Sequence, residues 1–154
     1  MAHALNLFVP IRQDADSQKL LADIEANFAT RDQALIEKAA RDSQILHFLR
    51  VLISPDRKYF VVLTEYDGSH EEYAEFFRVN LPDLFKQIFT LANGPEAWDQ
   101  VNNEKAFYAA SKSLQIRSLG NSVYDEKDPS GQTEGYLFHA YGPRTVKQIL
   151  PLLK

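Results

Sequence analysis

The stretch ILHFLRVLISPDRKYFVVLTEYDG, residues 45–68, decides the fold that we expect. Two apolar runs, residues 45–53 and 59–67, flank a polar turn that contains Pro55 and Asp56. Both runs are rich in the β-branched and aromatic residues that favour strands, and proline and aspartate favour a tight turn. The stretch therefore predicts an antiparallel β-hairpin.

A strand and a helix are predicted before this hairpin. Residues 4–12 are apolar and are bounded by polar residues, which is typical of a strand. Apolar residues then recur at helical spacing after a cap at Asp16 or Ser17, with a break near Thr30.

A second helix is predicted directly after the hairpin, because Ser69 and Glu72 match a capping box. Asp67, His70 and Glu71 have the side chains of metal ligands. Consecutive helical residues point in different directions, however, so His70 and Glu71 cannot face one site. The capping interpretation explains this segment, and we expect no metal.

The remaining elements are predicted from shorter signals. Pro82 is expected to kink or restart the second helix. A helical insertion is expected around residues 95–119 and a long polar loop around residues 120–135. GYLFHAYG, residues 135–142, predicts a last strand, and residues 145–150 predict the beginning of a short C-terminal helix.

The order strand, helix, strand, strand, helix, strand predicts an α+β fold. It matches the ferredoxin-like split βαβ pattern, an antiparallel sheet with both main helices on one face. Residues 1–154 are expected to form a single domain, since this length suits one hydrophobic core.

Alternation along the strands assigns the two faces of the sheet. One set is mostly aliphatic and is expected to pack against the helices: Leu5, Leu7, Val9 and Ile11; Ile45, His47, Leu49, Val51 and Ile53; Val61 and Leu63. The other set is aromatic with a few polar groups: Asn6 and Phe8; Leu46, Phe48, Arg50 and Leu52; Phe60, Val62, Thr64 and Tyr66; Tyr136 and Phe138. An aromatic face is unsuited to water, so we expect a second copy to cover it in a barrel-like homodimer.

His47 and Arg50 interrupt the aliphatic pattern of the second strand, and their spacing places them on opposite faces. His47 is expected to be a core histidine bonded to a carbonyl or to water. Arg50 needs a partner, because an unpaired buried charge is very costly. That partner is either a carboxylate, from Glu65, Asp67 or a second subunit, or an anionic ligand held bidentately.

Composition narrows the classes of function. The formal net charge is −4 and basic residues are not clustered, which argues against a nucleic-acid or anionic-membrane surface. Cysteine is absent, which excludes disulfides and thiol chemistry, and the N-terminus does not resemble a signal peptide. A cytoplasmic protein is therefore expected, although the absence of cysteine is also compatible with export. No Walker loop, GxGxxG or GxSxG motif is present, and we expect no cofactor.

Four segments of the chain, FVPI, ILHFLRVLI, LTEYDG and FHAYGPRTVKQI, resemble those of a family of dimeric α/β-barrel proteins without assigned activity. Members of this family share a P-I … H-F-x-R … D-G pattern. The matching positions are Pro10, Ile11, His47, Phe48, Arg50, Asp67 and Gly68. At the level of fold, the family is similar to antibiotic-biosynthesis-type monooxygenases, chlorite dismutases and dye-decolorising peroxidases. The resemblance implies a dimer, but fold alone does not fix function.

The chain departs from the haem members of that group, which use a proximal histidine on a late helix. Residues 144–154 contain no histidine, and His139 lies in the predicted last strand, so haem is not expected. The cofactor-free monooxygenases use Asn, Trp and Tyr or His around a hydrophobic cleft. Asn6, Tyr66 and Trp98 can take such parts, although a packing role suits Trp98 equally.

Three hypotheses of function follow. The first is binding of a small hydrophobic or anionic ligand in a cavity on the sheet face opposite the helices. Its expected ligand-binding residues are Asn6, Phe48, Arg50, Tyr66 and His139. The second is a cofactor-independent monooxygenase-like enzyme acting on a phenolic substrate, with His139 or His47 as the base. The third is a structural or regulatory dimer with a filled interior.

Overall fold

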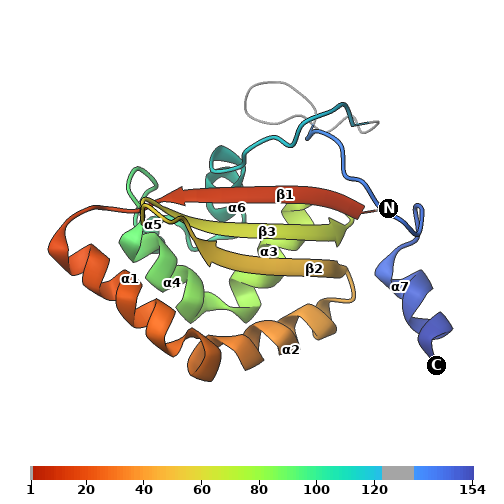
Figure 1. Ribbon diagram of the computed structural model, residues 1–154, viewed down its shortest axis with the longest axis horizontal. Coiled ribbons are helices and arrows are strands. Elements are labelled where there is room, and N and C mark those ends of the chain that lie inside the picture. The colour runs from red at the N-terminus through yellow and green to blue at the C-terminus, as the bar shows by residue number, and fades with distance from the viewer. Residues whose placement is uncertain (1, 123–133) are drawn as a thin grey trace.

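The computed structural model describes residues 2–122 and 134–154, and it has an α+β architecture (Figure 1). Its strands are β1 (Ala2–Pro10), β2 (Leu46–Ile53) and β3 (Tyr59–Asp67), and they form an antiparallel sheet in the order β1-β3-β2. The predicted hairpin is confirmed, because β2 and β3 are adjacent and antiparallel. This strand order is compatible with a ferredoxin-like arrangement.

Helices pack against one face of the sheet (Figure 1). The helices of this layer are α1 (Ala15–Asn27), α2 (Gln33–Ser43), α3 (His70–Asn80) and α4 (Pro82–Leu91), and the π-helix η1 (Phe28–Asp32) joins α1 to α2. The other described helices are α5 (Trp98–Val101), α6 (Glu104–Ser113), α7 (Val146–Ile149) and the 3₁₀-helix η2 (Leu150–Leu153). No helix among the described residues is long and apolar enough to cross a bilayer.

The predicted helix signals are confirmed in part, since only the Ser69 half of the predicted capping box is observed. The Ser69 hydroxyl accepts a hydrogen bond from the Glu72 N–H at 3.1 Å. Pro82 restarts the helical path after Leu81, whose φ of −129° and ψ of 48° lie outside the helical range. The first helix begins earlier than predicted, because the Asp14 carboxylate, rather than Asp16 or Ser17, caps it.

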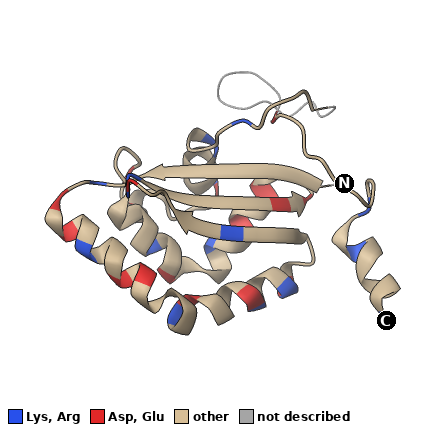
Figure 2. Cartoon of the chain, in the orientation of Figure 1, with Lys and Arg blue, Asp and Glu red and all other residues tan. Residues whose placement is uncertain are grey.

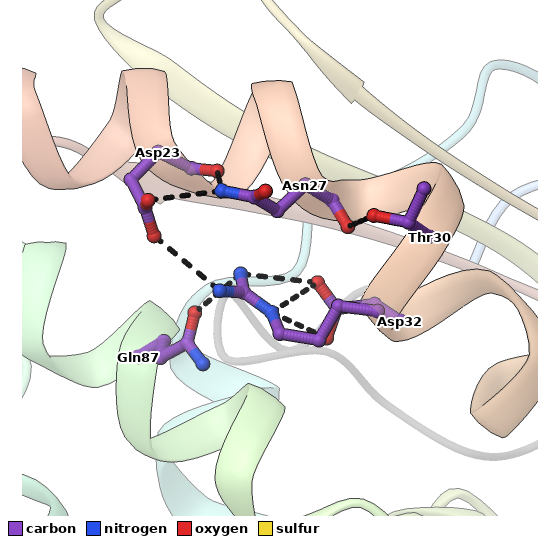
Figure 3. A network of polar contacts seen from close by, with 6 residues as sticks. Asp23, Asn27, Thr30, Asp32 and Gln87 are labelled. Atoms are coloured by element: carbon purple, nitrogen blue, oxygen red, sulfur yellow. Dashed lines mark hydrogen bonds and ion pairs between the residues drawn. The ribbon is translucent and has the colours of Figure 1, made fainter.

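A polar network ties the region of η1 to α4 at the predicted break (Figure 3). The Arg31 guanidinium donates to the carboxylates of Asp32 and Asp23 and, at 3.1 Å, to the Gln87 side chain. The Asn27 side chain donates to Asp23 at 2.9 Å. Because Arg31 and Asp23 are largely exposed, the ion pair between them adds little stability, and the network serves mainly to orient these helices.

The register of the sheet defines its two faces, because directly paired residues point to the same side. Cross-strand pairs place Leu5, Leu7, Val9, Leu49, Val51, Ile53, Phe60, Val62, Thr64 and Tyr66 toward the helices. The opposite side, here called the open face, carries Asn6, Phe8, Phe48, Arg50, Leu52, Val61, Leu63 and Glu65. In Figure 1 no helix crosses the front of the sheet.

The predicted faces of β3 were wrong. Phe60 and Tyr66, expected opposite the helices, are instead about 1% exposed in the core, and Val61 and Leu63 lie on the open face. Both alternating sets of β3 contain apolar residues: Val61 and Leu63 share one set with Glu65, whereas Phe60 and Val62 share the other with Thr64. The apolar residues alone therefore do not choose between the two faces. The hairpin register makes the choice, because it pairs Ile53 with Phe60.

The predicted face of Leu46 was also wrong, and a β-bulge explains why. The register shifts between Leu46 and Phe48, so His47 is an extra residue without a partner in the ladder. Leu46 consequently pairs with Tyr66 on the helix side, whereas Phe48 pairs with Glu65 on the open face. The bulge thus turns His47 away from the regular alternation.

The predicted last strand is not observed in residues 135–142. Residues 114–119 lie along the outer edge of β1 instead, where the Ile116 N–H donates to the Asn6 carbonyl at 2.8 Å. The Tyr136 N–H in turn donates to the Leu119 carbonyl at 3.0 Å. The predicted helical insertion contains α5 and α6, and most of the predicted loop lies outside the described residues.

Candidate functional site

The four histidines of the chain gather at one end of the sheet, where β1 and β2 begin and β3 ends. The His3 ring stacks on Tyr66 with 5.6 Å between ring centroids, and the His70 ring lies 6.4 Å from the same tyrosine. The His47 and His139 rings lie 5.7 and 6.3 Å from the ring of Tyr141. Segments far apart in sequence therefore meet at this end.

At this end of the sheet, Asp67, His47 and Tyr141 form a hydrogen-bonded relay, Asp67–His47–Tyr141. The His47 Nε2 lies 2.9 Å from the Asp67 Oδ1, and the His47 Nδ1 lies 2.8 Å from the Tyr141 Oη. A carboxylate can only accept, so Nε2 is assigned the proton and Nδ1 accepts from the tyrosine hydroxyl. Asp67 also accepts the Val146 N–H at 2.7 Å, which fixes the carboxylate against the start of α7.

The relay corrects the predicted role of His47. A carbonyl or water partner was expected, but the partner is a carboxylate, and the imidazole is 3% exposed. The bulge turns His47 toward the end of β3, where Asp67 lies. The motif H-F-x-R … D-G contains both His47 and Asp67, but regular alternation along the strands does not predict a contact between them.

Tyr141 is the outer member of the relay. Its ring lies nearly parallel to the His47 imidazole, at 19°, yet the residue is 41% exposed. Partial burial, and then the negative charges of Asp67 and Glu65, raise the pKa of the Tyr141 hydroxyl. Tyr141 therefore keeps its proton at neutral pH, covers His47 and still faces solvent.

His139 adds an unsatisfied polar atom beside Tyr141. Its Nδ1 is buried and has no hydrogen-bond partner within residues 2–122 and 134–154. Buried polar atoms of this kind usually bind water or a ligand. His139 was among the predicted ligand-binding residues, although it lies in an irregular segment rather than in a strand.

His70 lies deeper and has a different environment. Its Nε2 is 2.6 Å from the Ser111 Oγ, and the residue is 2% exposed. Burial, with a smaller effect of Lys112, lowers the pKa of His70 from 6.5 to about 4. His70 is consequently a neutral histidine that joins α3 to α6.

This buried histidine predicts a loss of stability in acid. The unfolded chain protonates His70 near pH 6.5 but the folded chain only near pH 4, so stability is present above pH 6.5 and falls between these values. The loss is roughly 3 kcal/mol, at 1.36 kcal/mol per pKa unit. Urea unfolding at pH 7.5 and 4.5 measures the change in the free energy of unfolding between these pH values. This change should be smaller for His70→Gln than for the unmodified chain, and equal changes in the two proteins would contradict this assignment.

The open face carries one charge of each sign near the relay. Arg50 is exposed, and no ion pair joins it to any described residue. Burial raises the pKa of the half-buried Glu65 carboxyl, and Arg50 and His47 act in the opposite direction. Figure 2 shows one basic band on β2 and no charged residue along β1.

The predicted ligand-binding residues are only partly brought together. Phe48 is 64% exposed and shares the open face with Arg50. The Asn6 side chain donates to the Ile116 carbonyl and the Ser118 hydroxyl, so it holds the neighbouring segment. Tyr66 lies in the core on the helix side.

Trp98 also takes a packing role. It is 9% exposed and belongs to a second apolar cluster with Phe89 and Phe107, away from the open face. Its ring centroid lies 5.9 Å from that of Phe89 and 6.0 Å from that of Phe107. Trp98 is thus separate from Asn6 and Tyr66, with which the sequence grouped it.

Two cavities lie beside the sheet, and neither is lined by Arg50. A small cavity of about 50 Å³ lies between the sheet and α3, α4 and α6, with an almost wholly apolar lining. A wider groove of about 770 Å³ runs between α2, β2 and α7, and its lining includes His47, Phe48, Val146 and Leu150. A closed cavity over Arg50 therefore requires a second covering surface.

Comparison with known proteins gives no relative for this site. The chain matches no family model, no curated protein and no solved structure. No cluster of three or more His, Asp or Glu residues suited to a metal ion is found in the part of the chain that the structure describes. Function must therefore be argued from the side chains themselves.

Proposed function

We propose that the chain is a homodimeric ligand-binding protein, with a small hydrophobic or anionic ligand held between two open faces. The exposure of large apolar side chains on this face supports the proposal. Phe48 is 64% exposed and Leu52 is 41% exposed, and both project from β2. Large apolar side chains exposed on one sheet face, here on either side of Arg50, favour an interface.

The charges of the open face favour a second copy as the partner. Arg50 and Glu65 have opposite signs, lie on adjacent strands and form no ion pair with each other. In a two-fold interface, a contact of one residue with another is repeated with the subunits exchanged. Arg50 of each copy can therefore meet Glu65 of the other, which makes the face complementary to itself. Two such sheets facing each other would form the dimeric α/β barrel of the ferredoxin-like class.

Arg50 is the proposed anchor for an anionic ligand. Its guanidinium has five N–H donors, enough to contact a carboxylate across the interface and a ligand at once. Phe8, Phe48 and Leu52 provide an apolar surface around it. This combination suits a small molecule with an apolar body and one anionic group.

Arg50→Lys tests the anchor, because it keeps the charge but loses the planar fork. The anionic dye 1-anilinonaphthalene-8-sulfonate, titrated by fluorescence, should bind the variant about tenfold more weakly, a loss of about 1.4 kcal/mol. Arg12→Lys, an exposed arginine near the other end of the sheet, is the matched control and should bind as the unmodified chain does. Equal dye affinity in all three proteins would contradict the role of Arg50, and light scattering checks that each remains a dimer.

A further inference from the structure

We propose that the Asp67–His47–Tyr141 relay is a proton-accepting site for a weakly acidic hydroxyl of the ligand, with Tyr141 as the residue that contacts it. This inference rests on the proposed ligand-binding function and adds the chemistry of the bound group. It gives His47 and Asp67 the role of positioning residues, since neither needs to touch the ligand.

The direction of the hydrogen bonds supports this role. Asp67 accepts from the His47 Nε2, and the His47 Nδ1 accepts from Tyr141, at 2.9 and 2.8 Å. The proton of Tyr141 is thus directed inward, and the remaining lone pair of its oxygen can accept a hydrogen bond from outside. Because Tyr141 is 41% exposed while the imidazole is 3% exposed, a ligand reaches the relay through the tyrosine.

The surroundings of Tyr141 fit an uncharged hydroxyl compound with an apolar body. Phe48 follows His47 directly and is exposed, and it also lines the groove that reaches Val146 and Leu150. Glu65 is close enough to Arg50 and to Tyr141 for electrostatic effects, which connects the relay with the open face. The unpartnered Nδ1 of His139 is a second polar atom beside Tyr141.

The proposed transfer is balanced and needs no oxidant. The ligand O–H bond breaks and its proton joins the Tyr141 Oη, while the Tyr141 O–H bond breaks and that proton joins the His47 Nδ1. The ligand becomes an anion, Tyr141 stays neutral, and His47 becomes an imidazolium beside the Asp67 carboxylate at 2.9 Å. Arg50 can then attract the anion from the open face. The raised pKa of Tyr141 agrees with a path on which no free tyrosinate forms.

The optical probe 4-nitrophenol tests the relay, because its anion absorbs visible light and its neutral form does not. At a pH one unit below the pKa of the free probe, bound probe should be mostly anionic, so the protein should lower the apparent pKa of the probe by one unit or more. Tyr141→Phe keeps the ring stacked on His47 but removes the hydroxyl, and it should abolish the shift. Tyr136→Phe, at a tyrosine 42% exposed on the same segment, should leave the shift unchanged.

His47→Asn distinguishes proton transfer to His47 from a purely structural role of this residue. Asparagine can still hydrogen-bond to Asp67 but takes up no proton near neutral pH, so the probe should bind without ionising. A probe that binds and ionises equally with Tyr141→Phe overturns the relay and leaves the ligand-binding function standing. Absence of any probe binding to the unmodified chain overturns the relay as well, whereas the proposed function is judged separately by the dye titration with Arg50→Lys.

Discussion

Phe48→Asp is expected to convert the proposed dimer into a monomer. The substitution places a carboxylate within the proposed interface, where an unpaired buried charge costs about 3–5 kcal/mol, enough to raise the dimer dissociation constant by at least a hundredfold. Phe48 is 64% exposed in a single chain, so the monomer should remain folded. Sedimentation velocity over a range of concentrations measures the change.

The control for this substitution is Leu35→Asp. Leu35 is 57% exposed on α2, which lies on the helix side of the sheet, so its replacement changes a similarly exposed apolar residue away from the open face. The Leu35 variant should sediment as the unmodified protein does. A Phe48→Asp variant that remains a folded dimer would show that the open face is not the interface.

Asp67→Ala is expected to destabilise the chain and to loosen its C-terminal segment. The alanine removes the acceptor for the buried His47 Nε2 and for the Val146 N–H. Each buried group left without a hydrogen bond costs about 1–3 kcal/mol. The cost is smaller for the Val146 N–H, because it can form a hydrogen bond to water instead. Urea unfolding measures the loss of stability, and hydrogen exchange at Val146 measures the release of the segment.

Two further variants make this prediction specific. Asp67→Asn keeps an oxygen acceptor and should retain part of the stability. Asp99→Ala removes an exposed carboxylate from α5 and should change stability by less than about 0.5 kcal/mol. If Asp67→Ala unfolds at the same urea concentration as the unmodified chain, the hydrogen bonds of Asp67 do not stabilise the fold, and this prediction is wrong.

Local signals in the sequence were sufficient for much of the fold. The hairpin was predicted because the Pro55–Asp56 turn separates two strand-like runs, and the helix restart because proline cannot continue a helix. The face of β3 was predicted wrongly, because the apolar Val61 and Leu63 were assigned to the helix side although Glu65 belongs to the same alternating set. The pairing with β2 places this set on the open face. The segment beside β1 was missed because residues 114–119 are held there by backbone hydrogen bonds to Phe8 and Asn6.

Less of the candidate site than of the fold could be predicted from the sequence. Arg50 and Phe48 were placed on one face because they follow the alternation of a strand. The contact of His47 with Asp67 depends on a β-bulge, and the residue pattern of the strand does not predict where the bulge occurs. Tyr141 lies 94 positions from His47, so only the folded chain brings its hydroxyl to the imidazole.

If two open faces meet and hold a small ligand, native mass spectrometry of the freshly purified, unmodified chain should detect both the pair of chains and the ligand. One spectrum reports both the number of chains and any small molecule that remains bound. We expect the mass of two chains together with a retained small molecule that leaves on collisional activation. The mass of a single bare chain at every protein concentration would contradict it.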